Sequence, residues 1–237
     1  MDTPQVNPHP ETPQNNDDLL SWFRCHPKIS IILGLILLFV IIGIVSGDGY
    51  DPDNAPFGAD EAFAYHKKYC DKDNMDACNK AGQILYFQKK YSEALTFYEK
   101  SCKLGGNGAC YNAGLMYKQA QGTIGNLGKF FEYMQKSCDL GYSKSCVMVA
   151  EVYHSPRNYN MENQIQQNEI KTFEYYQKGC ELNDGEACYW VGVFFHVGYG
   201  GIVKDMKRAM EFFRKSCKLG DKDNGCSKYK DLKELGY

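Results

Sequence analysis

The 237-residue sequence has almost no net charge and no clustered metal-binding side chains. Its formal net charge is −2, and it contains neither a basic stripe nor a zinc-finger spacing, so we expect no nucleic-acid partner. There is no Cys-x-x-Cys motif, no closely spaced pair of histidines and no glycine-rich phosphate-binding loop. These absences predict a chain that binds no metal and no cofactor.

One apolar segment, residues 29–47, stands apart from the rest of the chain. Its uncharged part from Ile29 to Val45 has a helical length of about 28 Å, close to the ~30 Å hydrocarbon core of a bilayer. Arg24 and Lys28 flank its N-terminal side, which favours a cytoplasmic N-terminus. We therefore expect a signal anchor that crosses a bacterial inner membrane once. The alternative is a signal peptide whose cleavage yields a secreted protein.

The segments that flank the apolar run have the composition of unfolded chain. Residues 1–28 are rich in Pro, Asn, Gln and Asp, which predicts a disordered cytoplasmic tail. Residues 48–58 are rich in Gly, Pro and Asp and are interpreted as a linker. The remaining domain, residues 59–237, is expected to lie in the periplasm.

Ten of the eleven cysteines form five pairs that recur along residues 59–237, and only Cys25 is left over. The members of a pair are eight residues apart, or nine in the last pair, and successive pairs begin 32 to 42 residues apart. A period of this length is typical of a two-helix unit and predicts an all-α repeat array. The pairs are Cys70 and Cys78, Cys102 and Cys110, Cys138 and Cys146, Cys180 and Cys188, and Cys217 and Cys226.

The cysteines separate two kinds of helix. The second cysteine of a pair opens one kind, in which small residues such as Ala81 and Gly82 share a face that a neighbouring backbone can approach. The first cysteine closes the other kind, which carries aromatic residues four and five positions earlier, with Met134 as the one exception, and a lysine that suits the helix dipole. We expect four such pairs of helices between lone helices near 60–70 and 223–235. The expected aromatic positions of the first kind are Tyr86, Tyr117, Tyr153 and Phe195.

The spacing within each cysteine pair predicts a local disulfide. A sharp turn in a loop of eight residues can bring two Cα atoms within the ~4.4–6.8 Å that a disulfide requires. Closing so short a loop stabilises the fold by roughly 2–3 kcal/mol in the chain-entropy model. Disulfides persist in the periplasm, so the cysteine usage agrees with the predicted topology.

The segment VGVFFHVGYGGIVKDMKRAMEFFRKSC, residues 191–217, combines small residues, aromatics, a glycine-rich loop, an Asp and a Lys-Arg-Ala sequence. In this pattern the chain resembles Sel-1-like repeats, relatives of the tetratricopeptide repeat. The cysteine pairs make it similar to the Helicobacter cysteine-rich protein family. Over residues 59–237 this resemblance implies a right-handed α/α superhelical solenoid with a concave face. The chain departs from the family in its apolar anchor and in a polar insertion at 155–168, and such insertions often lie on the binding side.

Two functional hypotheses follow. The architecture suggests a membrane-tethered scaffold that binds a protein or peptide through its concave face, since solenoids offer long surfaces. We expect Tyr111, Tyr189 and Trp190, which directly follow second cysteines, to face that groove.

The alternative hypothesis, β-lactam binding or hydrolysis, comes from the resemblance alone, because members of the family have been labelled β-lactamases. A serine β-lactamase needs Ser-x-x-Lys, Ser-Asp-Asn and Lys-Thr-Gly elements. Ser227 and Lys230 supply a Ser-x-x-Lys match, but Ser-Asp-Asn and Lys-Thr-Gly are absent. We therefore expect no catalytic residues.

Overall fold

The computed structural model of the protein describes residues 58–237. The predicted tail (1–28), the predicted transmembrane helix (29–47) and nearly all of the predicted linker (48–58) lie outside these residues and stay predictions. Among the residues that the structure describes, no helix is both long enough and apolar enough to cross a membrane. The structure thus bears on the repeat domain alone.

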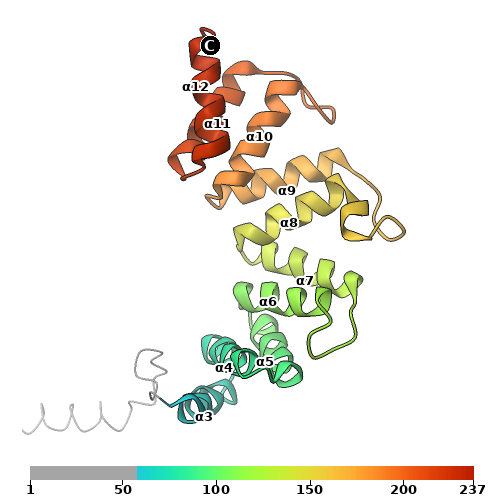
Figure 1. Ribbon diagram of the computed structural model, residues 1–237, viewed down its shortest axis with the longest axis vertical. Coiled ribbons are helices and arrows are strands. Elements are labelled where there is room, and N and C mark those ends of the chain that lie inside the picture. Colours follow the sequence, from blue (N-terminus) through green and yellow to red (C-terminus); the bar gives the residue numbers. More distant parts are fainter. Residues whose placement is uncertain (1–57) are drawn as a thin grey trace, which may run out of the picture. The chain divides into compact units, whose positions relative to one another are not determined.

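Residues 58–237 fold into α-helices joined by turns and contain no β-strand, which confirms the predicted all-α repeat array (Figure 1). Two short helical turns, η2 (Pro156–Tyr159, a 3₁₀-helix) and η3 (Lys222–Cys226, a π-helix), interrupt the series. The α-helices are α3 (Ala59–Cys70), α4 (Met75–Phe87), α5 (Tyr91–Lys103), α6 (Asn107–Lys118), α7 (Leu127–Asp139), α8 (Ser143–His154), α9 (Glu169–Glu181), α10 (Gly185–Val197), α11 (Met206–Lys218) and α12 (Ser227–Glu234).

The helices alternate between two roles along the stack. We call α4, α6, α8 and α10 the A helices and α5, α7, α9 and α11 the B helices. Each A helix packs against the B helix that follows it and against the helix that precedes it. Helix α3 precedes the first A helix as a lone B-like helix, as the sequence predicted.

The C-terminal end differs from the prediction of one regular helix over 223–235. The chain first forms the π-helical turn η3 and only then the short helix α12. A π-type turn holds more residues than an α-helical turn. It therefore takes up the ninth residue between Cys217 and Cys226, whose Cα atoms still lie 4.4 Å apart.

Every A helix is joined to its B helix by a loop that closes on the same backbone hydrogen bond. The N–H of the residue that caps the B helix donates to a carbonyl in the last turns of the A helix. These bonds run from Lys90 to Leu85, from Asn126 to Tyr117, from Asn168 to Tyr153 and from Asp205 to Phe195, at 2.8 to 3.0 Å. Because the loop ends are fixed in this way, the loop between them can vary in length without disturbing the helix pair.

All five predicted disulfides are present and join the end of one helix to the start of the next. Their Cα atoms lie 4.4–4.8 Å apart. The chain reverses through a residue of positive φ three positions after each first cysteine. These residues are Asp73, Gly105, Gly141, Asn183 and Gly220. The cysteines of the first four pairs are at most 1% exposed, so these bridges belong to the core.

Glycines on the A helices allow the following B helix to approach closely, as the sequence predicted. A Cβ atom on Gly192 would lie 2.7 Å from the ring of Phe213, and one on Gly82 would lie 2.9 Å from the ring of Tyr98. Both distances are shorter than van der Waals contact. Bulky B-helix side chains therefore fill the space that an A-helix side chain would otherwise need.

Aromatic rings stack between the two helices of a repeat. Tyr117 stacks on Tyr133, and Tyr153 stacks on Tyr175, with ring centroids 5.6 and 5.7 Å apart. Phe195 and Phe212 repeat this arrangement at 5.7 Å. A cation from the first turn of the B helix approaches the A-helix ring in each case. The cations are Lys129 at 4.6 Å, Lys171 at 4.9 Å and Arg208 at 5.3 Å from the ring centroids.

The first repeat corrects one sequence assignment. Tyr86 was expected at the recurring aromatic position, but Leu85 is the residue that receives the loop-closing hydrogen bond and is 1% exposed. Tyr86 lies one residue further on, is half-buried and packs against Tyr91. Because an α-helix rotates by about 100° per residue, a shift of one position moves a side chain to another face.

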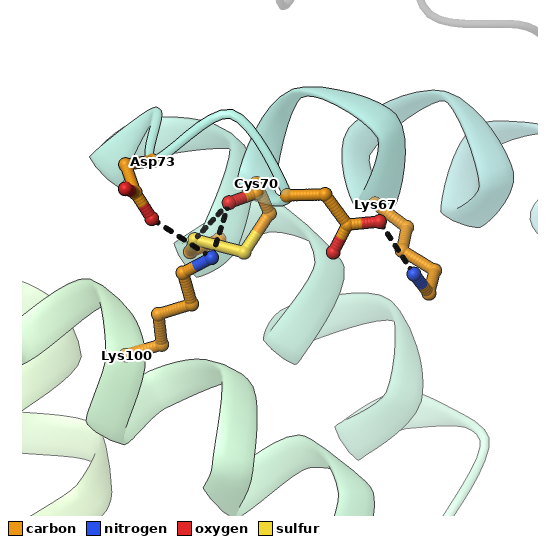
Figure 2. Close-up of polar contacts among 6 residues, drawn as sticks. Lys67, Cys70, Asp73 and Lys100 are labelled. Atoms are coloured by element: carbon orange, nitrogen blue, oxygen red, sulfur yellow. Dashed lines mark hydrogen bonds and ion pairs between the residues drawn. A yellow bond between two sulfur atoms is a disulfide. The ribbon is translucent and has the colours of Figure 1, made fainter.

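Lysines near the end of the B helices connect one repeat to the one before it. Figure 2 shows Lys100 of α5, whose Nζ donates to the carbonyl of Cys70 at 2.7 Å and pairs with Asp73 at 3.0 Å. Lys215 makes the corresponding bond to the carbonyl of Cys180 at 2.7 Å. Each lysine was predicted to interact with the dipole of its own helix. It also lies at the C-terminal end of the preceding B or B-like helix, where a cation is favoured in the same way.

Removing one bridge tests the contribution of the disulfides. We expect the double variant Cys138→Ser, Cys146→Ser to lose about 2–3 kcal/mol, because its unfolded chain is no longer constrained at that turn. Urea unfolding followed by circular dichroism under non-reducing conditions measures the loss. In excess reductant the wild type loses its bridges too, so the two curves should converge; identical midpoints without reductant would contradict a bond at this junction.

Adding a methyl group at Gly192 tests the close approach of the helices. We expect Gly192→Ala to lower stability, because overpacking against the buried ring of Phe213 costs about 1–3 kcal/mol and outweighs the ~1 kcal/mol gained in helix propensity. Gly108→Ala on α6 is the matched control, since no heavy atom lies within 4 Å of the added carbon there. Thermal unfolding should give opposite signs for the two variants, and a stabilised Gly192→Ala protein would refute the packing argument.

Candidate functional site

The candidate site is a cavity of about 580 Å³ formed around helices α8 and α10. Residues of α6, α9, η2 and the loop after α10 complete its walls, so it draws on the second, third and fourth helix pairs. The lining residues are Lys118, Glu151, His154, Ser155, Asn158, Tyr159, Tyr176, Trp190, Val193, Phe194, Val197 and Tyr199. Its volume is in the range of small-molecule sites, about 300–1000 Å³.

Aromatic rings from α9 and α10 form much of the lining. Trp190 stacks on Tyr176, with centroids 5.7 Å apart and planes 19° from parallel. Phe194 contacts Tyr199 at 5.6 Å. Val193 and Val197 follow on the same helix and add aliphatic surface. The side of α10 that is turned to the cavity is therefore almost wholly apolar.

The polar insertion at 155–168 builds another wall. Its first part folds into η2, and Met161 just beyond is 1% exposed, so the segment is anchored in the core. Tyr159 of η2 stacks on Phe130 with ring centroids 6.2 Å apart, and its hydroxyl donates to the Glu151 carboxylate. The insertion leaves the helix pair after α8 and returns at Asn168, whose N–H closes on Tyr153. It thus adds a cavity wall to an otherwise regular repeat.

Carboxylates dominate the charge around the cavity. Glu151 lines the cavity directly. The carboxylate of Glu169 lies 3.2 Å from Nδ1 of His154, which is itself a residue of the lining. Lys118 is the one lysine in the lining, and its Nζ lies 4.6 Å from the centroid of the Tyr159 ring.

The pKa values of the cavity tyrosines respond to this environment. Burial raises the pKa of Tyr176, and the negative charges of Glu151 and Glu186 raise it further. Burial and the hydrogen bond to Glu151 raise the pKa of Tyr159 as well. Both hydroxyls therefore stay protonated and act as neutral hydrogen-bonding groups.

The structure places the three predicted binding residues differently. Trp190 lines the cavity, whereas Tyr111 and Tyr189 do not. Tyr111 packs against the core and contacts Tyr142 at 5.0 Å, and Tyr189 contacts Phe213 at 5.7 Å. A ligand-binding role stays a prediction for all three.

Several cavity residues were missed from the sequence. Tyr176 lies at one of the aromatic positions before a first cysteine; it is 3% exposed and also borders the cavity. Tyr159 and Glu151 were not singled out. The unusual length of the insertion was the available signal, because it marked the repeat in which the wall differs.

The residues considered for catalysis are not assembled into a site. Ser227 and Lys230 are exposed on α12, Lys230 lies 3.8 Å from Glu234, and neither lines the cavity. Within residues 58–237, no group of three or more His, Cys, Asp or Glu side chains is placed to hold a metal ion.

Comparison with known proteins agrees with this repeat architecture. The Sel1 repeat family profile matches residues 76–106, 108–142, 145–184 and 185–221. Cytochrome c oxidase assembly factor 7 of Xenopus tropicalis is 35% identical over 105 residues, which cover 42% of this chain and 45% of the length of that protein. The chain therefore spans less than half of this relative.

Two solved structures share this fold. A Sel1 repeat protein from Oxalobacter formigenes is 20% identical, with a TM-score of 0.55 over 68% of this chain and 65% of that one. A protective antigen of uropathogenic Escherichia coli, 18% identical, also has a TM-score of 0.55, over 68% of this chain and 34% of that one. Helicobacter pylori cysteine-rich protein B is 28% identical over 58% of this chain and 93% of that one, with a TM-score of 0.44. The four matched segments make up more than half of the sequence, and the chain belongs to the Sel1 repeat family.

Proposed function

We propose that this protein is a membrane-tethered repeat scaffold that binds a segment of another protein in the cavity around α8 and α10. The observation that carries this proposal is the cavity itself, whose lining combines the aromatic rings of Tyr159, Tyr176 and Trp190 with apolar side chains of α10. Sel1 repeats form a protein-interaction scaffold, and this site lies where one repeat departs from the regular pattern. A binding role explains the insertion, because the other helix pairs close their A–B loops with the same hydrogen bond and without such a segment.

The tether is proposed from the apolar run at residues 29–47, whose length suits a bilayer. The five disulfides support an oxidising location for the repeat domain, since such bonds persist outside the cytosol. Together they favour a domain held at the outer surface of a membrane, such as the periplasmic face of a bacterial inner membrane. A partner would then be an exported protein or the exported part of a membrane protein.

Site-specific photo-crosslinking in intact cells tests the binding site. A photoreactive residue at position 197 should give a discrete protein adduct, because Val197 lines the cavity and is 59% exposed. The same residue at position 124 is the control, since Ile124 is 89% exposed but does not line the cavity. The added substitution Val193→Phe should abolish the adduct at position 197 by filling the site while the melting temperature stays the same.

Two outcomes would contradict the proposal. An equal yield at position 124 would show that the adduct reflects exposure alone, and an adduct that persists with Val193→Phe would place the partner outside the cavity. The tether is checked in the same cells by deleting residues 29–47. The full chain should sediment with membranes and the deleted chain should not; equal sedimentation would refute the tether.

A further inference from the structure

The charge at the cavity is unbalanced toward the negative. The lining contains one carboxylate, that of Glu151, and one ammonium group, that of Lys118. Two further carboxylates lie near enough to affect the cavity tyrosines. The charge of Glu186 raises the pKa of Tyr176 and of Tyr159, and the charge of Glu169 raises the pKa of Tyr176. The charges of Glu151, Glu186 and Glu169 all raise the pKa of Tyr176. Glu151 in the lining and Glu169, 3.2 Å from Nδ1 of the lining residue His154, outnumber the one ammonium group of Lys118, and this favours a cation in the cavity.

The aromatic rings of this chain accept cations repeatedly. Lys118, a residue of the lining, already lies over the Tyr159 ring. Lys171 and Arg208 approach the rings of Tyr153 and Phe195 in the same manner. A positive charge near an aromatic face is attracted by the ring quadrupole, and the attraction grows when water is excluded. The indole of Trp190 is the strongest such partner in the lining.

The apolar part of the lining distinguishes a side chain from a small free cation. Val193, Phe194 and Val197 present hydrocarbon along α10. Lysine and arginine place an aliphatic stem on such a surface while the charged head reaches a polar group. The volume of about 580 Å³ also leaves room for residues next to that side chain.

We infer that this cavity selects a lysine or arginine side chain of an extended peptide segment, with the charged head near Glu151 and the stem against α10. This inference deepens the proposed function and rests on it, because it names the chemistry of the bound segment. Lys118 then limits affinity, since it repels the incoming cation from the edge of the same site. An acidic peptide would need the opposite arrangement, with Lys118 as its anchor.

The fluorescence of Trp190 gives a direct measurement. The sequence holds two tryptophans, Trp22 and Trp190, so the variant Trp22→Phe of the full-length protein reports on the cavity alone. The protein is reconstituted into lipid vesicles, and blocked pentapeptides with the sequence Gly-Gly-X-Gly-Gly are titrated into it. X is lysine, arginine, norleucine, Nε-acetyl-lysine or glutamate.

We expect the lysine and arginine peptides to bind at least about tenfold more tightly than the norleucine and acetyl-lysine peptides, which keep the stem and lack the charge. The glutamate peptide should bind most weakly. Equal binding of lysine and norleucine peptides would overturn the inference while leaving the proposed peptide site in place. Absence of binding by all five peptides would count against both, and tighter binding of the glutamate peptide would reverse the assignment of charge.

Two variants with opposite expected effects separate the charge from the fold. Glu151→Gln should weaken binding of the lysine peptide by about fivefold or more, because it removes the negative charge. Binding of the norleucine peptide should stay the same, because glutamine keeps an acceptor for the Tyr159 hydroxyl. Lys118→Gln should increase the affinity for the lysine peptide, because it removes a charge that repels the peptide's cation. Glu174→Gln is the matched control on α9, where an exposed carboxylate outside the lining is neutralised.

The melting temperatures of all three variants show whether the fold is retained. Weakening by Lys118→Gln, or equal weakening by Glu151→Gln and Glu174→Gln, would refute recognition of a cation at this site. A loss of fluorescence response in the Glu151→Gln protein for the norleucine peptide as well would point to a collapsed cavity. In that case Glu151→Asp, which keeps the charge, must restore preference for lysine, or the inference fails.

Discussion

The reversal of the chain between one helix pair and the next is the constraint on which the structure depends. A residue of positive φ turns the backbone, a disulfide fixes the two helix ends about 4.5 Å apart, and a lysine from the next B helix binds the freed carbonyl where Lys100 meets Cys70. Neighbouring repeats in a linear array contact only each other, so each junction must be defined locally. The turn and the disulfide recur at all five junctions, and the lysine bond is added at Cys70 and Cys180.

The opposite end of each helix pair is held more permissively. One backbone hydrogen bond closes the loop between the A and B helices, whether that loop is short, as at Lys90, or long, as before Asn168. The fold therefore tolerates change at one edge while its other edge stays uniform. The cavity lies near this tolerant edge, where the added segment supplies Asn158 and Tyr159 to its lining. The regular helix pairs support the cavity, and the insertion at 155–168 adds one of its walls.

The sequence predicted the repeat order, the disulfides and the close helix contacts because each of these recurs. The cysteine spacing set the junctions, and the glycines that follow marked the face where helices meet. Single events were harder to predict. Tyr86 was placed one position out of register because four aromatics were expected where three occur, with Leu85 in the fourth place. The π-helical turn η3 follows from one extra residue in the last pair. The cavity could not be predicted, since Glu151, Tyr159 and Trp190 come from segments whose approach depends on tertiary packing.

The burial of the sulfur atoms has a consequence for how the protein matures. The bridges from Cys70–Cys78 to Cys180–Cys188 are almost inaccessible once the helices are stacked. A thiol oxidase cannot reach them in the finished domain, because exchange requires direct attack on sulfur. We therefore expect the bridges to form before the surrounding repeats are fully stacked. On this view the oxidant acts on an incompletely packed chain and not on the finished domain.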